Sequence, residues 1–149
     1  MKERSLIIII LFFILGCSSM KNMQRIHFTF NDLHKRCKLI LFIPRYYSLQ
    51  RIEAGGEDGV ERRYWYRDSS VIYISTFRGG SSLNYENIRK QEAAYSKRFG
   101  FDTITLSGVN DSGKYWKEVK YYNLYYGYAN VKEEEKKYFD QAICSIQIK

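Results

Sequence analysis

The feature that most restricts the fold of this chain is a pair of strand-like segments joined by a short polar link. Both segments, Glu61–Arg67 and Val71–Phe77, are rich in aromatic and β-branched residues, which favour pleated, half-buried surfaces. The link, Asp68-Ser69-Ser70, consists of residues that favour turns. This order predicts a β-hairpin. Because 149 residues include 14 Tyr and 9 Phe but only one Pro, we expect a sheet-rich globular domain and not a disordered chain.

Further strands and two helices are expected around this hairpin. Apolar or alternating segments predict strands at 38–43, 46–52 and 102–106, and two more within 114–131 that bend near Asn123. A first helix is predicted after an N-cap at Ser82 or Asn84, with apolar residues at helical spacing and Gly100 at its end. A second helix is predicted to begin at Glu133–Glu135, where acidic side chains suit the helix dipole.

The order of strands, helix, strands and helix predicts an α+β domain at residues 27–149, with an antiparallel sheet packed by two helices. Its core is expected to contain Ile72, Ile74, Ile88, Phe99, Phe139 and Ile143. The stretch Gly127–Val131, followed by Phe139–Ile143 and Ser145, resembles PsbP-like domains. That resemblance implies the same order of elements and a closing helix that runs into a short strand. It implies no function, because one fold hosts many activities.

The N-terminal segment has the pattern of a secretory signal peptide. Lys2 and Arg4 precede a ten-residue apolar run, 6–15, which is too short to span about 30 Å of hydrocarbon. The sequence Ile14-Leu15-Gly16-Cys17 resembles the lipobox of bacterial lipoproteins. The resemblance implies a signal peptide at 1–16, a lipid on Cys17 and a tether at 17–26. It implies a location in the bacterial cell envelope, with the periplasmic or surface side of the outer membrane as the expected place, and it leaves the membrane and its face open.

Basic residues are frequent after this segment. The chain carries a formal net charge of +8, and residues 21–38 hold five Lys or Arg against one Asp. Near a membrane, each base contributes about 1 kcal/mol of attraction to anionic headgroups. The alternative is a solvated linker and strand edge. A nucleic-acid partner is not expected for an exported chain.

The cysteine and histidine residues offer one candidate disulfide and no candidate metal site. If Cys17 carries lipid, Cys37 and Cys144 remain as a candidate disulfide in an oxidising compartment, or as two separate small apolar residues. His27 and His34 lack a second pair of ligands at metal spacing. We therefore expect no metal site and no cofactor.

Two stretches carry candidate contacts. A candidate anion site precedes the first predicted helix and consists of Arg78, Gly79, Gly80, Ser81 and Ser82. A candidate contact surface interleaves aromatic residues with bases in segments 62–67 and 114–128, and its members are Tyr64, Trp65, Tyr66, Trp116, Tyr125, Tyr126 and Tyr128. These aromatic side chains either stack on a glycan or partner protein or pack in the core while the bases reach solvent.

Two functions remain open at this stage. The first is a lipid-anchored envelope protein that binds a partner protein or a glycan without catalysis, in a narrower form an immunity protein that blocks an incoming toxin. The second is an envelope enzyme that acts on cell wall or glycan through carboxylates such as Glu57, Asp58 or Glu118. Such an enzyme needs two acids in one cleft, and the spacing of these residues does not pair them.

Overall fold

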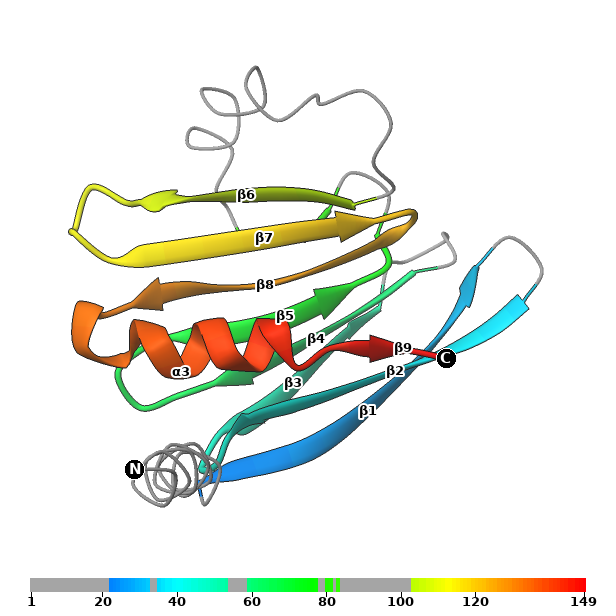
Figure 1. Cartoon of the computed structure of the whole chain (residues 1–149), viewed down its shortest axis with the longest axis horizontal. Helices are drawn as coiled ribbons and strands as arrows, with labels where there is room; N and C mark the ends of the chain where they lie inside the picture. Colours follow the sequence, from blue (N-terminus) through cyan, green and yellow to red (C-terminus); the bar gives the residue numbers. More distant parts are fainter. Residues whose placement is uncertain (1–21, 33–34, 54–58, 78–79, 82, 84–102) are drawn as a thin grey trace, which may run out of the picture.

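The computed structural model describes residues 22–32, 35–53, 59–77, 80–81, 83 and 103–149. In this part of the chain, two antiparallel sheets and one helix form the fold (Figure 1). The smaller sheet has the order β1-β2-β9, with β1 at Met23–Asp32, β2 at Lys35–Pro44 and β9 at Gln147–Ile148. The larger sheet has the order β3-β4-β5-β8-β7-β6. Its strands are β3 (Ser48–Glu53), β4 (Val60–Trp65), β5 (Val71–Ser75), β6 (Thr103–Val109), β7 (Tyr115–Tyr121) and β8 (Leu124–Val131). The helix, α3, spans Glu133–Cys144.

The predicted hairpin is present as β4 and β5. Tyr64 lies opposite Ile72, and the Tyr66 N–H donates to the Ser70 carbonyl to close the turn. Asp68 Oδ1 accepts hydrogen bonds from the Ser70 N–H and hydroxyl. A carboxylate that binds the backbone two residues later is the reason Asp favours such turns. The expected strand pair within 114–131 is also present, with its bend at Tyr122-Asn123 between β7 and β8.

The predicted fold class is wrong. Nine strands and a single helix make up the described part of the chain, so the fold is mainly antiparallel β rather than α+β with two helices on the sheet. The layer beside α3 is a second sheet, which begins at Met23 within the expected tether. Its first strand is amphipathic: Ile26, Phe28 and Phe30 are buried, and polar residues alternate with them. The helix predicted between Ser82 and Gly100 lies outside the described residues.

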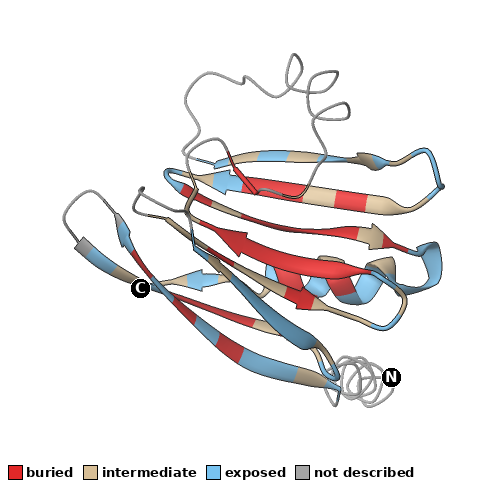
Figure 2. Ribbon diagram, turned by 180° about the vertical axis from the view of Figure 1, so that it is seen from behind, coloured by how far each residue is buried: buried red, intermediate tan, exposed pale blue. Residues whose placement is uncertain are grey.

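The core lies between the large sheet and a layer formed by α3 and the small sheet (Figure 2). We call the face of the large sheet that points into this core its helix side. Ile72 and Ile74 reach it from β5, and Phe139 and Ile143 reach it from α3. All four are buried, as predicted. The other two expected core residues, Ile88 and Phe99, lie outside the described residues.

The opposite face of the large sheet, which we call the back side, buries polar groups. Cross-strand pairing places Arg63, Tyr73, Gly127 and Glu118 in one row across β4, β5, β8 and β7. The Tyr73 hydroxyl donates to Glu118 Oε2 at 2.7 Å. Its ring crosses the sheet over Gly127, where a Cβ would lie 2.9 Å from that hydroxyl and 2.0 Å from the Lys117 carbonyl oxygen. The fold therefore requires glycine at this point.

The closing helix leads into β9, which pairs with β2 through Leu39 and Ile148. Backbone hydrogen bonds in both directions join Lys38 to Lys149 at 2.8 and 2.9 Å. The turn after α3 is held to β2 as well, because Ser145 Oγ accepts from the Phe42 N–H. The short final strand that the PsbP-like resemblance implied is therefore present. It extends the small sheet.

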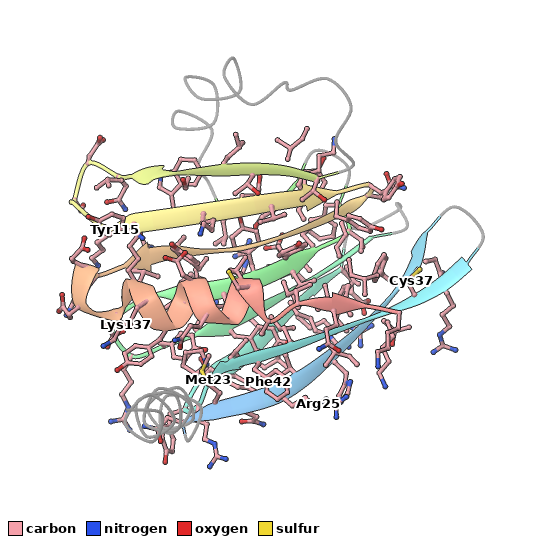
Figure 3. The ribbon with its side chains drawn as sticks, in the orientation of Figure 1. Met23, Arg25, Cys37, Phe42, Tyr115 and Lys137 are labelled. Carbon is pink, nitrogen blue, oxygen red and sulfur yellow. The ribbon has the colours of Figure 1, made fainter. Side chains whose placement is uncertain are left out.

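Cys37 and Cys144 are both free thiols. Cys37 lies near the tip of the β1–β2 hairpin (Figure 3), whereas Cys144 precedes Ser145, which contacts β2 at Phe42. Five residues of strand separate Phe42 from Cys37, about 17 Å at 3.3 Å per residue. A disulfide needs Cα atoms within about 7 Å. The candidate disulfide is therefore incompatible with the register of the small sheet.

Candidate functional site: a tyrosine groove

An open groove of about 690 Å³ lies where β1 begins and β2 ends. We call it the tyrosine groove. The β4–β5 turn and the middle of α3 complete its walls. Its lining residues are Asn22, Met23, Pro44, Arg45, Tyr46, Tyr66, Arg67, Asp68, Glu135, Lys137, Tyr138 and Phe139. The volume lies in the range of small-ligand sites.

Tyr66 forms the fixed inner wall of the groove. Its hydroxyl donates to the Pro44 carbonyl at 2.9 Å, and its ring meets Phe139 edge to face with centroids 5.3 Å apart. Burial, followed by the nearby Tyr47, Tyr64 and Glu135, raises the pKa of Tyr66 far above its ordinary value. The phenol is therefore neutral at every physiological pH. It acts as a positioned wall and not as a base.

Tyr46 and Tyr138 form the exposed rim. Tyr46 is 87% exposed and has a φ of 67°, a left-handed conformation that is uncommon for a bulky residue. Tyr138 is 39% exposed, and Lys137 Nζ lies 4.9 Å from the centre of its ring. Exposed aromatic faces of this kind offer stacking surface to a sugar ring or to a side chain of a partner. This backbone conformation lies just after the end of β2, where Tyr46 lines the groove.

Asp68 contributes a carboxylate to the groove wall. Burial by itself raises the pKa of Asp68, but the hydrogen bonds from Ser70 and the charge of Lys132 outweigh it and leave the pKa below its ordinary value. The group is therefore ionised at neutral pH. Its Oδ2 atom is buried and finds no hydrogen-bond donor among the described residues. A buried acceptor without a donor costs about 1–3 kcal/mol.

Charges of both signs surround these rings. Arg45, Arg67 and Lys137 line the groove together with Asp68 and Glu135. Guanidinium and ammonium groups donate hydrogen bonds, and carboxylates accept them. Aromatic faces beside mixed donors and acceptors suit a ligand with both apolar faces and hydroxyl or amide groups. Glycans and peptide segments both have this character.

The seven aromatic residues of the predicted contact surface do not form one patch, so that prediction requires correction. Tyr64, Tyr126 and Tyr128 are buried on the helix side of the large sheet, and Trp116 is buried on the back side. Trp65 and Tyr125 are half-buried on the back side. Neighbouring strand residues point to opposite faces, which separates Tyr64 from Trp65 and Tyr125 from Tyr126. Only Tyr66 reaches the groove.

The candidate anion site lies mostly outside the described residues, because only Gly80 and Ser81 of its five members are described. Both are buried, and Ser81 Oγ accepts a hydrogen bond from the Leu83 N–H. Cys17, Glu57 and Asp58 also lie outside the described residues. Within the described ranges, no group of three or more His, Cys, Asp or Glu residues is placed to hold a metal ion.

Glu118, the third carboxylate considered for an enzyme, belongs to the back side. It is buried and accepts the hydrogen bond from Tyr73. Glu61, the other acid buried on this face, pairs with Arg63 at 2.5 Å. Both carboxylates are held by neighbouring side chains of the sheet, and neither lines the tyrosine groove. This arrangement is typical of structural polar pairs within a sheet.

The comparisons with known proteins assign no family: no protein-family model, no curated protein and no solved structure matches the chain. Of the helices in the described part of the chain, none has the length and apolar character needed to cross a bilayer.

Sequence reasoning missed the groove because its parts are far apart in the chain. Tyr46 follows the only proline of the sequence, and Tyr138 lies on the exposed face of a predicted helix. Each has one aromatic neighbour in the sequence, Tyr47 or Phe139, but lies outside the aromatic segments 62–67 and 114–128. The available signal was indirect: Arg45-Tyr46-Tyr47 directly after Pro44 marks the end of a strand, where loops carry binding residues more often than strands do.

Proposed function

We propose that this protein is a lipid-anchored, non-enzymatic binding protein of the bacterial envelope, and that the tyrosine groove binds an envelope protein segment or a glycan. The observation that carries the proposal is the groove itself, whose lining combines the exposed rings of Tyr46 and Tyr138 with the fixed ring of Tyr66. Tyr and Arg dominate binding hot spots, and Arg45 and Arg67 lie in the same lining.

The lipobox-like sequence supports the location of this site. Met23 lines the groove and lies six residues after Cys17. Six extended residues reach at most about 20 Å. A lipid on Cys17 therefore keeps the groove at the membrane surface, where stable anchoring requires more than one acyl chain. A ligand of the groove is accordingly expected near that surface.

Site-specific photo-crosslinking in cells tests the groove. A photoreactive phenylalanine analogue placed at Tyr46 is expected to give a discrete covalent adduct with a protein or a glycan. The matched control carries the analogue at Tyr122, which is also exposed but lies in the β7–β8 turn. An adduct at 46 that is lost in Tyr138→Ala, and is absent at 122, supports the proposal. Equal labelling at both positions, or at neither, contradicts it.

Two measurements on the same preparation test the remaining parts of the proposal. Mass spectrometry is expected to show a mature N-terminus at Cys17 that carries acyl chains, whereas an intact Met1 contradicts the anchor. Incubation of the purified protein with cell-wall sacculi is expected to give binding without soluble fragments. Fragment release that is abolished by Asp68→Asn would show an enzyme instead, because hydrolysis of a glycan needs a carboxyl group at the reacting bond.

A further inference from the structure

The small sheet turns a strongly basic face away from the core. On β1 and β2, the outward positions pair Arg25 with Phe42, His27 with Ile40 and Thr29 with Lys38. Figure 3 shows Arg25 beside Phe42 on this hairpin. We call this surface the basic face and define it by its exposed bases Arg25, Arg36, Lys38 and Lys149, together with His27.

No acidic side chain among the described residues shares this face. The described residues provide no ion-pair partner for its four Lys and Arg side chains, whereas Arg51 and Arg63 of the large sheet both pair with glutamates. Slight desolvation, followed by the charges of Lys38 and Arg25, lowers the pKa of His27. The charges of Lys38 and Arg25 therefore add to a positive local potential around His27.

The position of the basic face in the chain limits which surfaces it can contact. β1 begins at Met23, so a lipid on Cys17 holds the first residues of the basic face within about 20 Å of the bilayer. β1 extends for ten residues from that point, about 33 Å. A strand anchored at one end can lie along the membrane over its whole length. Phe42 lies beside Arg25 and is half-buried, and an apolar group at such a position favours the headgroup boundary, whereas Ile40 is buried.

We propose that the basic face docks on anionic lipid headgroups and so orients the protein on the membrane, with the tyrosine groove at the edge of the contact. This inference rests on the proposed anchoring at Cys17. The charge pattern favours a lipid surface because the bases are spread along β1 and β2 and at Lys149 and do not converge on one point. A bilayer presents its charge in the same distributed way.

The test uses the anchored protein reconstituted into vesicles. Thr29 lies on the basic face and Ser107 lies on β6 of the large sheet. Each is replaced by Cys in a background with Cys37→Ser and Cys144→Ser, labelled with a fluorophore, and placed in vesicles of zwitterionic lipid with or without phosphatidylglycerol. Lipids with a spin-labelled headgroup quench only fluorophores that touch the surface. Mass spectrometry of the same sample reports the lipid on Cys17 separately, so a missing anchor is distinguishable from a face that does not dock.

The probe at 29 is expected to be quenched in vesicles with phosphatidylglycerol, and the probe at 107 is not. Quenching at 29 should disappear at about 0.5 M salt, because the Debye length there is only a few ångströms and the attraction between charges is screened. The double reversal Arg25→Glu with Lys38→Glu should reduce it more than tenfold, since each base near an anionic surface contributes about a fivefold preference. The control Arg51→Glu with Lys120→Glu changes the net charge equally on the large sheet and should leave it unchanged.

Three results would overturn the proposal. Equal quenching in purely zwitterionic vesicles would show that charge does not drive the contact. Equal quenching of the probes at 29 and 107 would show no preferred orientation. An unquenched probe at 29 on an anchored protein would leave the basic face available to an acidic partner protein in place of the membrane.

Discussion

The two faces of the large sheet bury side chains of different chemistry. The helix side is apolar: residues such as Ile72, Ile74 and Leu124 pack beneath α3 and the small sheet. The back side buries Glu61 with Arg63 and Tyr73 with Glu118, in rows that cross the same strands. The helix side is therefore stabilised by area removed from water, whereas the back side depends on each polar group keeping its partner.

This difference shows why the aromatic segments were misleading. The sequence Arg62-Arg63-Tyr64-Trp65-Tyr66-Arg67 sends alternate residues to the two faces. Arg62 stays on the helix side, where its guanidinium lies 5.2 Å from the Phe28 ring centre and Nη1 donates to the His27 carbonyl. Arg63 is on the back side with Glu61. Arg62 and Arg63, which lie beside aromatic residues in the sequence, therefore both contact other side chains or backbone of the fold. Neither of them forms part of a contact surface.

The largest effect is expected on the helix side. Phe139→Ala removes a buried ring that contacts Tyr66 and Tyr128, with centroids at 5.3 and 5.7 Å. The free energy of unfolding should fall by about 3–5 kcal/mol, measured by denaturant titration. Tyr138→Ala, next to it on the same helix but exposed, is the control and should cost far less. A loss below about 1 kcal/mol for Phe139→Ala would mean that α3 is not part of the core.

An intermediate effect is expected on the back side. Tyr73→Phe keeps the ring and removes the hydroxyl that donates to Glu118. Because the carboxylate is buried, loss of that donor should lower the free energy of unfolding by about 1–3 kcal/mol. Tyr46→Phe, which removes a solvent-exposed hydroxyl, is the control and should have no measurable effect. Equal stability of Tyr73→Phe and wild type would show that the polar row is not a stability determinant.

The smallest effect is expected at the rim of the helix side, under acid. Asp140 accepts hydrogen bonds from Lys117, Lys136 and the Tyr128 hydroxyl. Burial alone would raise the pKa of Asp140, but the two lysines and Tyr128 bring it below its ordinary value of 3.8. Its contribution, about 1 kcal/mol or less, is therefore complete above pH 3.8 and is lost as the pH falls through the folded-state pKa.

Unfolding titrations at neutral and acidic pH measure this contribution. Asp140→Asn should be less stable than wild type at neutral pH, and the difference should shrink as the pH falls below 3.8. Asp111→Asn, in the exposed β6–β7 turn, is the matched control. A difference between Asp140→Asn and wild type that does not change with pH would contradict the ionic role of this carboxylate.

Much of the local structure could be predicted, and its assembly could not. The β4–β5 hairpin, the β7–β8 bend and α3 follow from local patterns, namely Asp68 in a turn, Asn123 at a bend and three glutamates at a helix start. The first residues of β1, 23–26, were assigned to a polar tether, and no strand was predicted for the rest of β1. Its buried set, Ile26, Phe28 and Phe30, alternates as clearly as that of any other strand.

The tyrosine groove could not be predicted either, because it is formed by residues that only the tertiary structure brings together. Tyr66 was identified as a contact residue on local composition, but its neighbours in the groove come from positions 44–46 and 135–139. Nothing in the spacing of these residues indicates that they meet. Their contact follows from the register of β1 against β2 and from the path of α3 along the large sheet.

The pairing of β9 with β2 also determines when the fold can be completed. Phe42 and Ser145 are 103 residues apart in the chain and share a hydrogen bond, so the central strand of the small sheet gains its second neighbour only after nearly the whole domain has been synthesised. Until then, β2 presents an unpaired edge of Lys-Leu-Ile-Leu-Phe, which is a template for misassembly. Pairings this distant in sequence also slow folding. A nascent chain of this protein should therefore need protection at β2 for as long as it is incomplete.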